Sequence, residues 1–282
     1  MSKLSITTII PVFAENILQI KMLSNALNSL QEQTLIPSEI ILSDNSLNEE
    51  CIYQIKQICK ISDLSINYLT NHEHVGAAKN TNFAASHASS DLIHILYQDD
   101  FILNKNLYKE ACRIFNENID IWVIAQGRVE ERILESKFDF ATKFGFNELG
   151  GPSSLIVARK NFISFNPNYR MNFDVINYHE YFLTLGEPLI IRGVNIQFGI
   201  HEFQLSNKVK SKEVYHELLK FIQSYNITGI DIMTAVKSIK REVFHQRLLL
   251  IAGLVSRKIS LKFFVVNFLI SISRSVKRKI FN

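Results

Sequence analysis

The stretch VGAAKNTNFAASHASSDLIHILYQDD, residues 75–100, decides the fold. Its first part, residues 76–88, opens with glycine and is rich in alanine, which predicts a helix packed closely on a sheet. The apolar run LIHILY, residues 92–97, predicts a buried strand. Asp99 and Asp100 follow this strand, and adjacent carboxylates disfavour each other's ionisation unless a positive group lies near them. The stretch therefore predicts a helix followed by a strand, with a site for a positive partner where the strand ends.

The same alternation of strand and helix runs outward from this stretch over residues 5–126. Apolar runs predict strands at residues 5–12, 39–44, 65–69, 92–97 and 120–126, and apolar residues at helical spacing predict helices between them. Pro11 is expected to end the first strand. Five alternations indicate an α/β fold, a mostly parallel Rossmann-like sheet with flanking helices. The alternation fades after about residue 127, and residues 208–282 indicate a helical C-terminal extension.

Composition describes an ordinary globular protein of 282 residues, with 47% hydrophobic and 21% charged residues, and excludes a disordered chain. Cys51, Cys59 and Cys112 form neither a disulfide framework nor a metal-binding pattern, which favours a reduced, cytoplasmic setting. The N-terminal segment leads directly into a strand and lacks the pattern of a secretory signal.

Charge is unevenly distributed along the chain. Glu242 is the last acidic residue, and the 40 residues after it carry eight basic side chains. Residues 1–242 hold 23 basic and 27 acidic side chains, a net charge of −4. A mildly acidic body with a basic tail indicates that the two parts have different partners.

Polar residues gather where three predicted strands end: residues 11–15, 44–46 and 98–100. Ligands of such sheets bind beyond the carboxyl ends of the strands. Each group alone is also typical of a turn or a helix cap. Their coincidence on three strands favours one binding crevice.

Six segments, in order, resemble the motifs of the family 2 glycosyltransferases with the GT-A fold. They are TTIIPVFAEN (7–16), EIILSDNS (39–46), residues 75–100, GGPSSLIVARKN (150–161), FDVINYHEYFLTLGEP (173–188) and IHEFQLS (200–206). The resemblance covers about residues 5–207. It implies an inverting glycosyltransferase of the hexosyltransferase type that moves a sugar from a nucleotide-diphosphate donor.

The resemblance also implies a divalent metal, Mg²⁺ or Mn²⁺, which suits carboxylate and phosphate oxygens. Asp99 is the predicted ligand, with Asp100 as a helper and His201 near the metal or the diphosphate. The family's Asp-x-Asp motif aligns with residues 97–99, so Tyr97 replaces its first carboxylate. The alternative for the acidic pair is a cap on the following helix.

For the nucleotide, the resemblance and the strand ends together give six candidate residues: Pro11, Phe13, Glu15, Asp44, Asn82 and Gln98. An apolar ring beside acceptor groups suits a nucleobase with N–H donors and a ribose with hydroxyls. Catalysis also needs a base to take the proton of the acceptor hydroxyl. Asp174 matches the family's acidic residue by its spacing to Gly186, and its alternative role is a helix N-cap.

The predicted domains are a catalytic domain at residues 1–207 and a helical region at 208–282. In the first, a nucleotide-sugar half extends to about residue 126 and an acceptor half follows over residues 127–207. The longest uncharged stretch of the tail, residues 263–273, has 11 residues, far short of the roughly 20 needed to span a bilayer.

Basic residues that flank apolar ones fit a helix lying on an anionic membrane. This predicts a cytoplasmic enzyme, peripheral on the inner face of the cytoplasmic membrane, with a saccharide or polyprenyl-linked acceptor in bacterial surface polysaccharide synthesis. Alternatives for the tail are a helix docked on the catalytic domain and a nucleic-acid contact, but no stacking platform supports nucleic acid. Alternatives for the whole chain are a nucleotidyltransferase and a catalytically silent sugar-nucleotide-binding protein.

Overall fold

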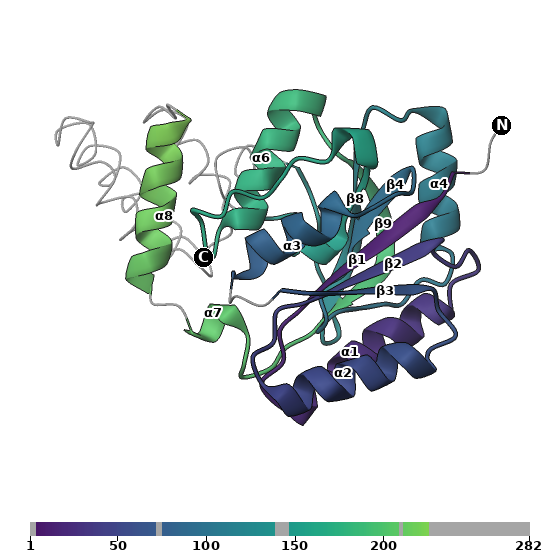
Figure 1. The fold of residues 1–282 in the computed structure, drawn as a ribbon. Helices are drawn as coiled ribbons and strands as arrows, with labels where there is room; N and C mark the ends of the chain where they lie inside the picture. The colour runs from purple at the N-terminus through teal and green to yellow at the C-terminus, as the bar shows by residue number, and fades with distance from the viewer. Residues whose placement is uncertain (1–3, 72–74, 139–146, 209–210, 226–282) are drawn as a thin grey trace, which may run out of the picture. The chain divides into compact units, whose positions relative to one another are not determined.

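The computed structural model, drawn in Figure 1, describes residues 4–71, 75–138, 147–208 and 211–225. The chain divides into two compact units, one ending at Lys210 and the other beginning at Ser211. The second unit is described over helix α8 (Ser211–Ser224) and the residue after it. The basic tail beyond Glu242 lies outside the described residues.

The described part of the first unit is built on a nine-stranded sheet. Its strands are β1 (Ile6–Val12), β2 (Glu39–Asp44), β3 (Ile66–Thr70), β4 (Leu92–Ile95), β5 (Phe101–Ile102), β6 (Trp122–Val129), β7 (Arg132–Ile133), β8 (Leu155–Ala158) and β9 (Leu189–Phe198). The helices are α1 (Ile17–Gln31), α2 (Glu49–Ile61), α3 (Ala77–Ser86), α4 (Leu107–Glu117), α6 (Phe173–Leu185) and α7 (Leu205–Lys208), with 3-10 turns η1 (Pro152–Ser154) and η2 (Arg159–Asn161).

The sheet has two halves that differ in strand direction. Strands β3, β2, β1 and β4 are neighbours in that order and all run parallel; we call them the parallel half. Strands β8, β6, β9, β5 and β7 form the mixed half, in which β8 lies antiparallel between β4 and β6. The predicted α/β class is confirmed. The predicted fifth strand, β6, is therefore separated from β4 by β8.

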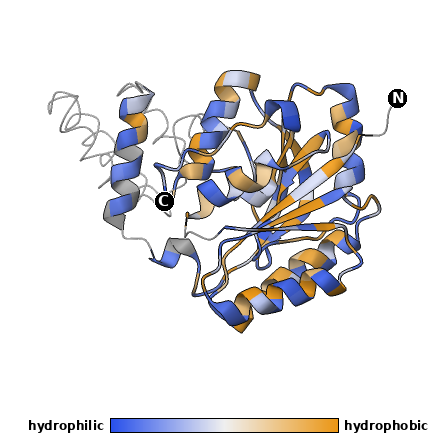
Figure 2. Ribbon diagram, viewed as in Figure 1, coloured by the Kyte–Doolittle hydropathy of each residue, from blue (hydrophilic) through white to orange (hydrophobic). Residues whose placement is uncertain are grey.

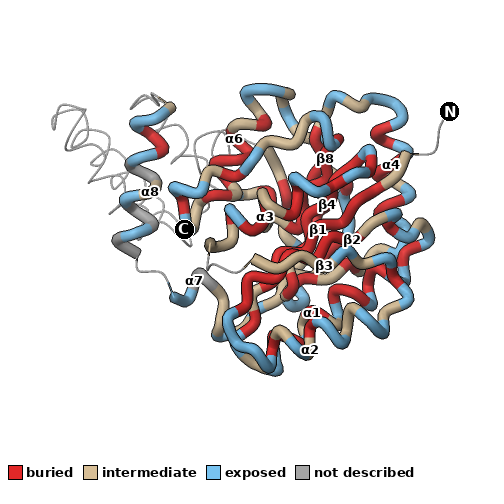
Figure 3. Tube along the Cα trace, in the orientation of Figure 1, coloured by how far each residue is buried: buried red, intermediate tan, exposed pale blue. Residues whose placement is uncertain are grey.

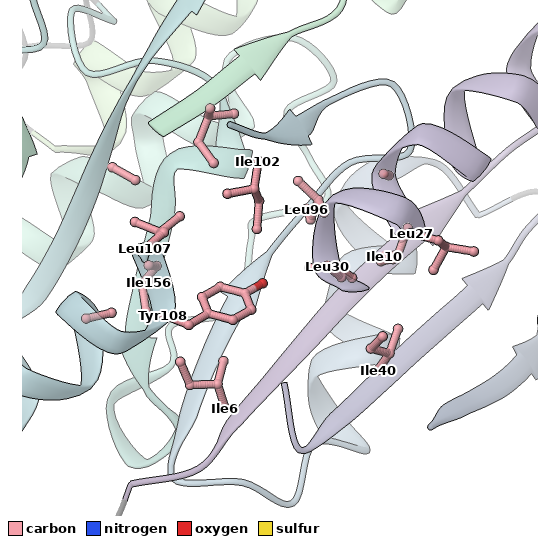
Figure 4. Close-up of a cluster of buried hydrophobic side chains, with 14 of the residues drawn as sticks. Ile6, Ile10, Leu27, Leu30, Ile40, Leu96, Ile102, Leu107, Tyr108 and Ile156 are labelled. Carbon is pink, nitrogen blue, oxygen red and sulfur yellow. The ribbon is translucent and has the colours of Figure 1, made fainter. Parts of the chain in front are cut away.

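Helices cover both faces of the sheet, because alternate strand residues point to opposite sides. Figures 2 and 3 show the strands as largely hydrophobic and buried. On one face, Ile6 and Tyr108 belong to a core shared with α1, α2 and α4 (Figure 4). On the other, Trp122 stacks on Tyr178 and Tyr181 of α6, with ring centroids 5.8 and 5.4 Å apart. Burial of each large apolar side chain contributes about 1.5–3 kcal/mol, which fixes the strand ends that carry the polar loops.

Strand β1 includes Pro11 and ends one residue later at Val12, in agreement with the strand predicted at residues 5–12. Pro11 pairs with Ser43 of β2, whereas the register with β4 extends only to Ile9. A proline has no N–H to donate, and it is tolerated where one side of the strand is no longer paired.

None of the helices within the described ranges is long and apolar enough to cross a membrane.

Candidate active site

Three polar loops meet at one edge of the parallel half, where β1, β2 and β4 end. The N–H of Asn45 donates to the carbonyl of Val12 at 2.8 Å, and the N–H of Ala14 donates to Ser46 Oγ at 2.8 Å. The loops after the first two strands are thus joined directly. The polar strand ends therefore lie together, as their spacing predicts.

Gln98 joins the loop after β4 to the loop after β1. Its Nε2 donates to the carbonyl of Phe13 at 2.8 Å, and the N–H of Phe13 donates to its Oε1 at 2.7 Å. Gln19 supports the same loop, because its Oε1 accepts the N–H of Glu15 at 2.7 Å. Gln98 therefore fixes the backbone that presents Phe13 at the edge of the sheet.

Glu15 is exposed at the end of this loop, and its Oε2 lies 2.8 Å from Lys208 Nζ in α7. Both side chains are more than 40% exposed, so this ion pair contributes little to stability. This ion pair nevertheless places α7, the last described helix of the first unit, beside the loop after β1.

Asp44 is a buried carboxylate at the end of β2. Its Oδ2 accepts the phenol proton of Tyr68 at 2.7 Å, and its Oδ1 accepts the N–H of Ser46 at 2.9 Å. Burial, together with the bond to Asp44, raises the pKa of Tyr68 well above its usual value. Tyr68 therefore stays a neutral donor that orients this carboxylate.

Two asparagines of α3 bind backbone groups. Asn82 donates to the carbonyl of Phe165 at 2.8 Å and accepts its N–H at 2.8 Å. Asn80, which sequence reasoning missed, is buried and binds the hydroxyl of Ser43 at 2.6 Å and its carbonyl at 2.8 Å. The periodicity of an alanine-rich helix gives no signal that one of its two asparagines faces the sheet.

Asp99, in the loop after β4, and His201, in the segment after β9, come together in the fold. Asp99 Oδ2 accepts from His201 Nε2 at 3.0 Å, although the two residues are 102 positions apart. The Asp99 side chain is 22% exposed and that of His201 only 7%. Within the described residues, the buried Nδ1 of His201 has no hydrogen-bond partner. The acidic pair thus meets an imidazole at the end of β9.

Asp100 is buried beside this pair. Its Oδ2 accepts the hydroxyl proton of Ser153 at 2.5 Å, and its Oδ1 accepts the N–H of Gly199 at 2.9 Å. Burial first, and then the charge of Asp99, raises the pKa of Asp100 well above its usual range. A Cβ at Gly199 would clash with the carbonyl of Asp99, so the approach of the two backbones requires glycine there.

Tyr97 stands where the family motif has its first carboxylate. Its hydroxyl lies 2.9 Å from Thr81 Oγ1. Because Thr81 uses its own proton on the carbonyl of Ala77, Tyr97 is the donor. Burial raises the pKa of Tyr97, and the charges of Asp174, Asp99 and Asp100 act in the same direction. The residue is therefore a neutral phenol among three acidic residues.

Asp174 is the second residue of α6, and the N-cap position belongs to Asn172. Its Oδ1 accepts the N–H of Val175 at 2.7 Å, and its Oδ2 accepts from Asn147 Nδ2 at 2.9 Å. Asn147 also donates to the carbonyl of Gly150 at 2.9 Å, so it links Asp174 to the loop before η1. This amide partner was not predicted from the sequence.

The residues present fit a divalent metal at Asp99 and His201. A carboxylate oxygen and an imidazole nitrogen are ligands that Mn²⁺ accepts, and the two groups lie 3.0 Å apart with the imidazole largely buried. In the described part of the chain, no cluster of three or more His, Cys, Asp or Glu side chains forms a candidate metal site. A metal ion here would thus take further ligands from phosphate oxygens, as is usual for Mg²⁺.

Comparison with known proteins gives two kinds of match. A sequence model described as Glycosyl transferase family 2 matches residues 7–162. TarS 1–349 of S. aureus in complex with UDP-GlcNAc superposes with a TM-score of 0.61 at 16% identity, over 92% of this chain and 77% of that one. The mannosyltransferase PcManGT of Pyrobaculum calidifontis, in complex with GDP-Man and Mn²⁺, gives 0.63 at 11% identity, over 96% and 81%.

The chain covers 46% of the longer TarS structure, slightly less than half its length. At these identities the structural likeness shows a shared fold. No curated protein sequence matches this chain.

Proposed function

The chain belongs to glycosyl transferase family 2, and on that premise we propose that it is a metal-dependent, inverting glycosyltransferase. The family membership confirms the predicted family and gives sugar transfer as the reaction class; four of the six motifs lie within the matched residues 7–162. In our proposal the donor is a sugar on a nucleoside diphosphate. The acceptor is a saccharide or a lipid-linked saccharide in bacterial surface polysaccharide synthesis. The observation that carries the proposal is the Asp99–His201 pair, in which Asp99 belongs to the loop that Gln98 joins to the loop after β1.

Asp99 and His201 would hold a divalent metal, Mg²⁺ or Mn²⁺, with Asp100 as a helper. The metal's chemistry would be that of a Lewis acid, which stabilises the negative charge on the departing diphosphate. The relative with Mn²⁺ in its complex supports this choice of ion. Tyr97 lowers the negative charge of the site by one unit compared with a carboxylate at the same position, so Asp99 carries the charge that faces the metal.

The nucleotide would lie against the loops at the edge of the parallel half. We assign Pro11, Phe13 and Glu15 to the base and ribose and Asp44 to the base edge. Gln98 and Asn82 would act on this site by fixing the backbones of Phe13 and Phe165. Complexes of TarS with UDP and UDP-GlcNAc and of PcManGT with GDP-Man support a nucleotide sugar as the ligand class.

Asp174 is the proposed general base. In the transfer step, the acceptor hydroxyl gives its proton to Asp174 while its oxygen attacks the anomeric carbon. The bond from that carbon to the diphosphate oxygen breaks, and the diphosphate keeps the electron pair. The bond from Asn147 holds one carboxylate oxygen, which leaves Asp174 in a fixed orientation for this proton transfer.

For the rest of the chain, we propose a catalytic domain at residues 1–207, with a nucleotide-sugar half to residue 126 and an acceptor half after it. The basic tail would bind the anionic inner face of the cytoplasmic membrane. Such a location would bring the enzyme to a polyprenyl-linked acceptor.

Donor turnover tests the proposal against its alternatives. Purified protein is incubated with UDP-GlcNAc, UDP-glucose or GDP-mannose, with and without Mn²⁺, and release of the nucleoside diphosphate is measured. We expect release that requires the metal and that falls about 10³-fold in Asp99→Asn. Release of pyrophosphate from nucleoside triphosphates would indicate a nucleotidyltransferase instead. Tight binding of a donor without turnover, with or without acceptor saccharides, would indicate a silent binding protein.

A further inference from the structure

Ser153 binds the turn after β4 at two points. Its hydroxyl has one proton, which it donates to Asp100 Oδ2 at 2.5 Å. Ser153 Oγ itself accepts the N–H of Tyr97 at 2.9 Å. Both points flank Asp99, the proposed metal ligand. A single buried serine of η1, just before β8, thus defines the course of the backbone that carries Asp99.

The backbone of Ser153 is itself anchored in the core. Its carbonyl lies 2.9 Å from His94 Nε2, and His94 Nδ1 lies 2.8 Å from the hydroxyl of Tyr108. A carbonyl only accepts, so His94 carries its proton on Nε2 and its Nδ1 accepts from Tyr108. Tyr108 in turn lies 2.6 Å from Thr8 Oγ1. All four residues are fully buried, so Ser153 is held by the interior of the protein and not by solvent-exposed loops.

Asp100 continues this chain to the end of β9. Its second oxygen accepts the N–H of Gly199, and Gly199 lies two residues before His201. Both oxygens of Asp100 therefore already accept hydrogen bonds from the protein, whereas Asp99 meets His201. The bonds joining Ser153, Asp100 and Gly199 are here called the latch.

We propose that Ser153 is a positioning residue of the metal site, because the latch places His201 beside Asp99. In this inference Asp100 acts through the latch and is not itself a metal ligand. The inference rests on the proposed function, since it assigns to Asp99 and His201 the binding of the metal. It adds a requirement that the ligands alone do not impose, namely that η1 must hold the turn after β4.

The chain offers a matched control in the neighbouring serine. Ser154 is as fully buried as Ser153, but its hydroxyl has no hydrogen-bond partner within the described residues. Ser153→Ala and Ser154→Ala therefore remove the same atom from adjacent positions of η1. Only the first change removes the latch.

Two readouts other than activity are compared for these variants. In metal-free protein, hydrogen–deuterium exchange of the peptide containing Gly199 should be several-fold faster in Ser153→Ala and unchanged in Ser154→Ala. Mn²⁺ is then titrated with UDP or GDP present, and free Mn²⁺ is followed by electron paramagnetic resonance. We expect Mn²⁺ affinity about 10- to 100-fold weaker in Ser153→Ala, the usual effect of removing a group that orients a ligand, and unchanged in Ser154→Ala.

Variants of Asp100 separate a latch from a ligand. Asp100→Asn keeps an oxygen for the N–H of Gly199, and its amide can donate to Ser153 Oγ in place of the bond that the carboxylate accepts, so it should bind Mn²⁺ nearly as wild type does, whereas Asp100→Ala should resemble Ser153→Ala. If Ser153→Ala does not fold, this Asn and Ala pair carries the test. Loss of Mn²⁺ binding in Asp100→Asn as complete as in Asp99→Asn would make Asp100 a ligand and overturn the inference.

Failure of the inference differs from failure of the proposed function. Equal exchange and equal Mn²⁺ affinity in Ser153→Ala and Ser154→Ala would exclude the latch while leaving Asp99 and His201 as ligands. A wild-type protein that binds no Mn²⁺ would instead remove the proposed metal. The exchange of the Gly199 peptide then decides by itself whether Ser153 holds the end of β9.

Discussion

The two halves of the sheet build the site by different means. The parallel half supplies side chains from the ends of its strands and the loops that directly follow them, such as Asp44, Gln98 and Asp99. Segments next to the strands of the mixed half contribute groups that fix those loops from far away in the sequence, such as Ser153 of η1, just before β8, and the backbone of Gly199, just after β9. The chemical groups of the site therefore follow from the order of the parallel strands. Their positions depend on how closely the strands of the mixed half approach the loops of the parallel half.

Close approach in the mixed half depends on glycine. A Cβ at Gly127 of β6 would lie 2.7 Å from the carbonyl of Ile196 and would overlap the ring of Phe198 on β9. Strands β6 and β9 pair in parallel with an irregularity next to this glycine. The end of β9, and with it His201, is therefore positioned by the absence of a side chain. The parallel half places its residues without such a device.

The largest expected effect is that of Asp99→Asn. The variant keeps the shape of the side chain but loses the charge that faces the metal. We expect turnover to fall about 10³-fold, by analogy with other groups that stabilise charge in the transition state, and metal-dependent nucleotide binding to be lost. Donor turnover and Mn²⁺ titration measure both, and an unchanged melting temperature is the control. Unaltered turnover would show that Asp99 is not a ligand of a metal needed for the reaction.

A smaller loss is expected for Asp174→Asn, on the acceptor side. A general base acts in the chemical step, so kcat should fall about 10²-fold while the KM of the donor stays nearly constant. Together with Asp99→Asn, this separates donor binding from proton transfer. If the variant only lowers the melting temperature, Asp174 stabilises the first turn of α6 and is not the general base.

His94, on β4 where the parallel half meets β8 of the mixed half, gives a prediction for how the stability of the protein depends on pH. Burial lowers the pKa of His94 from 6.5 to about 4, so the unfolded chain binds a proton between these values and the folded chain does not. Stability from this group is complete above about pH 6.5 and falls by about 1.4 kcal/mol per pH unit as the pH drops toward 4. Urea unfolding at several pH values should show a flatter dependence for His94→Gln. The exposed His87→Gln is the control and should keep the wild-type slope; equal slopes in all three proteins would contradict the buried, neutral state of His94.

Much of the parallel half can be predicted from sequence, because each strand and the polar residues after it are adjacent in the chain. Asp44 at the end of β2 and Asp99 after β4 occupy the strand-end positions that the sequence predicts. The latch could not be predicted, since no periodicity relates Ser153 to Asp100 over 53 residues, although Ser153 lies inside a motif that was recognised. Burial of polar residues is equally hidden: Asn80 and Asn82 look alike in an alanine-rich helix, and only packing decides which backbone each one binds.

The smallest expected effect concerns the basic tail, which lies outside the described residues and rests on sequence alone. Each basic residue near an anionic surface contributes on the order of 1 kcal/mol, and salt screens this contribution. Burial of Phe263, Phe264, Leu269 and Ile270 would add a hydrophobic contribution that salt does not weaken. Full-length protein should therefore sediment with vesicles of anionic lipid, less so as salt rises, but with some binding retained at high salt.

Truncation before Arg257 shows whether the tail is separate from both halves of the sheet. The shortened protein should lose vesicle binding while its donor turnover with a water-soluble acceptor, and its melting temperature, remain close to those of the full chain. Vesicles of neutral lipid are the control, because they lack the charge that attracts the tail and should bind the full chain weakly. If truncation unfolds the enzyme and the full chain ignores anionic vesicles, the tail is part of the folded core. The charge asymmetry of the sequence would then reflect a solvated basic surface, since a helix docked on the catalytic domain buries its apolar side and leaves its lysines and arginines in water.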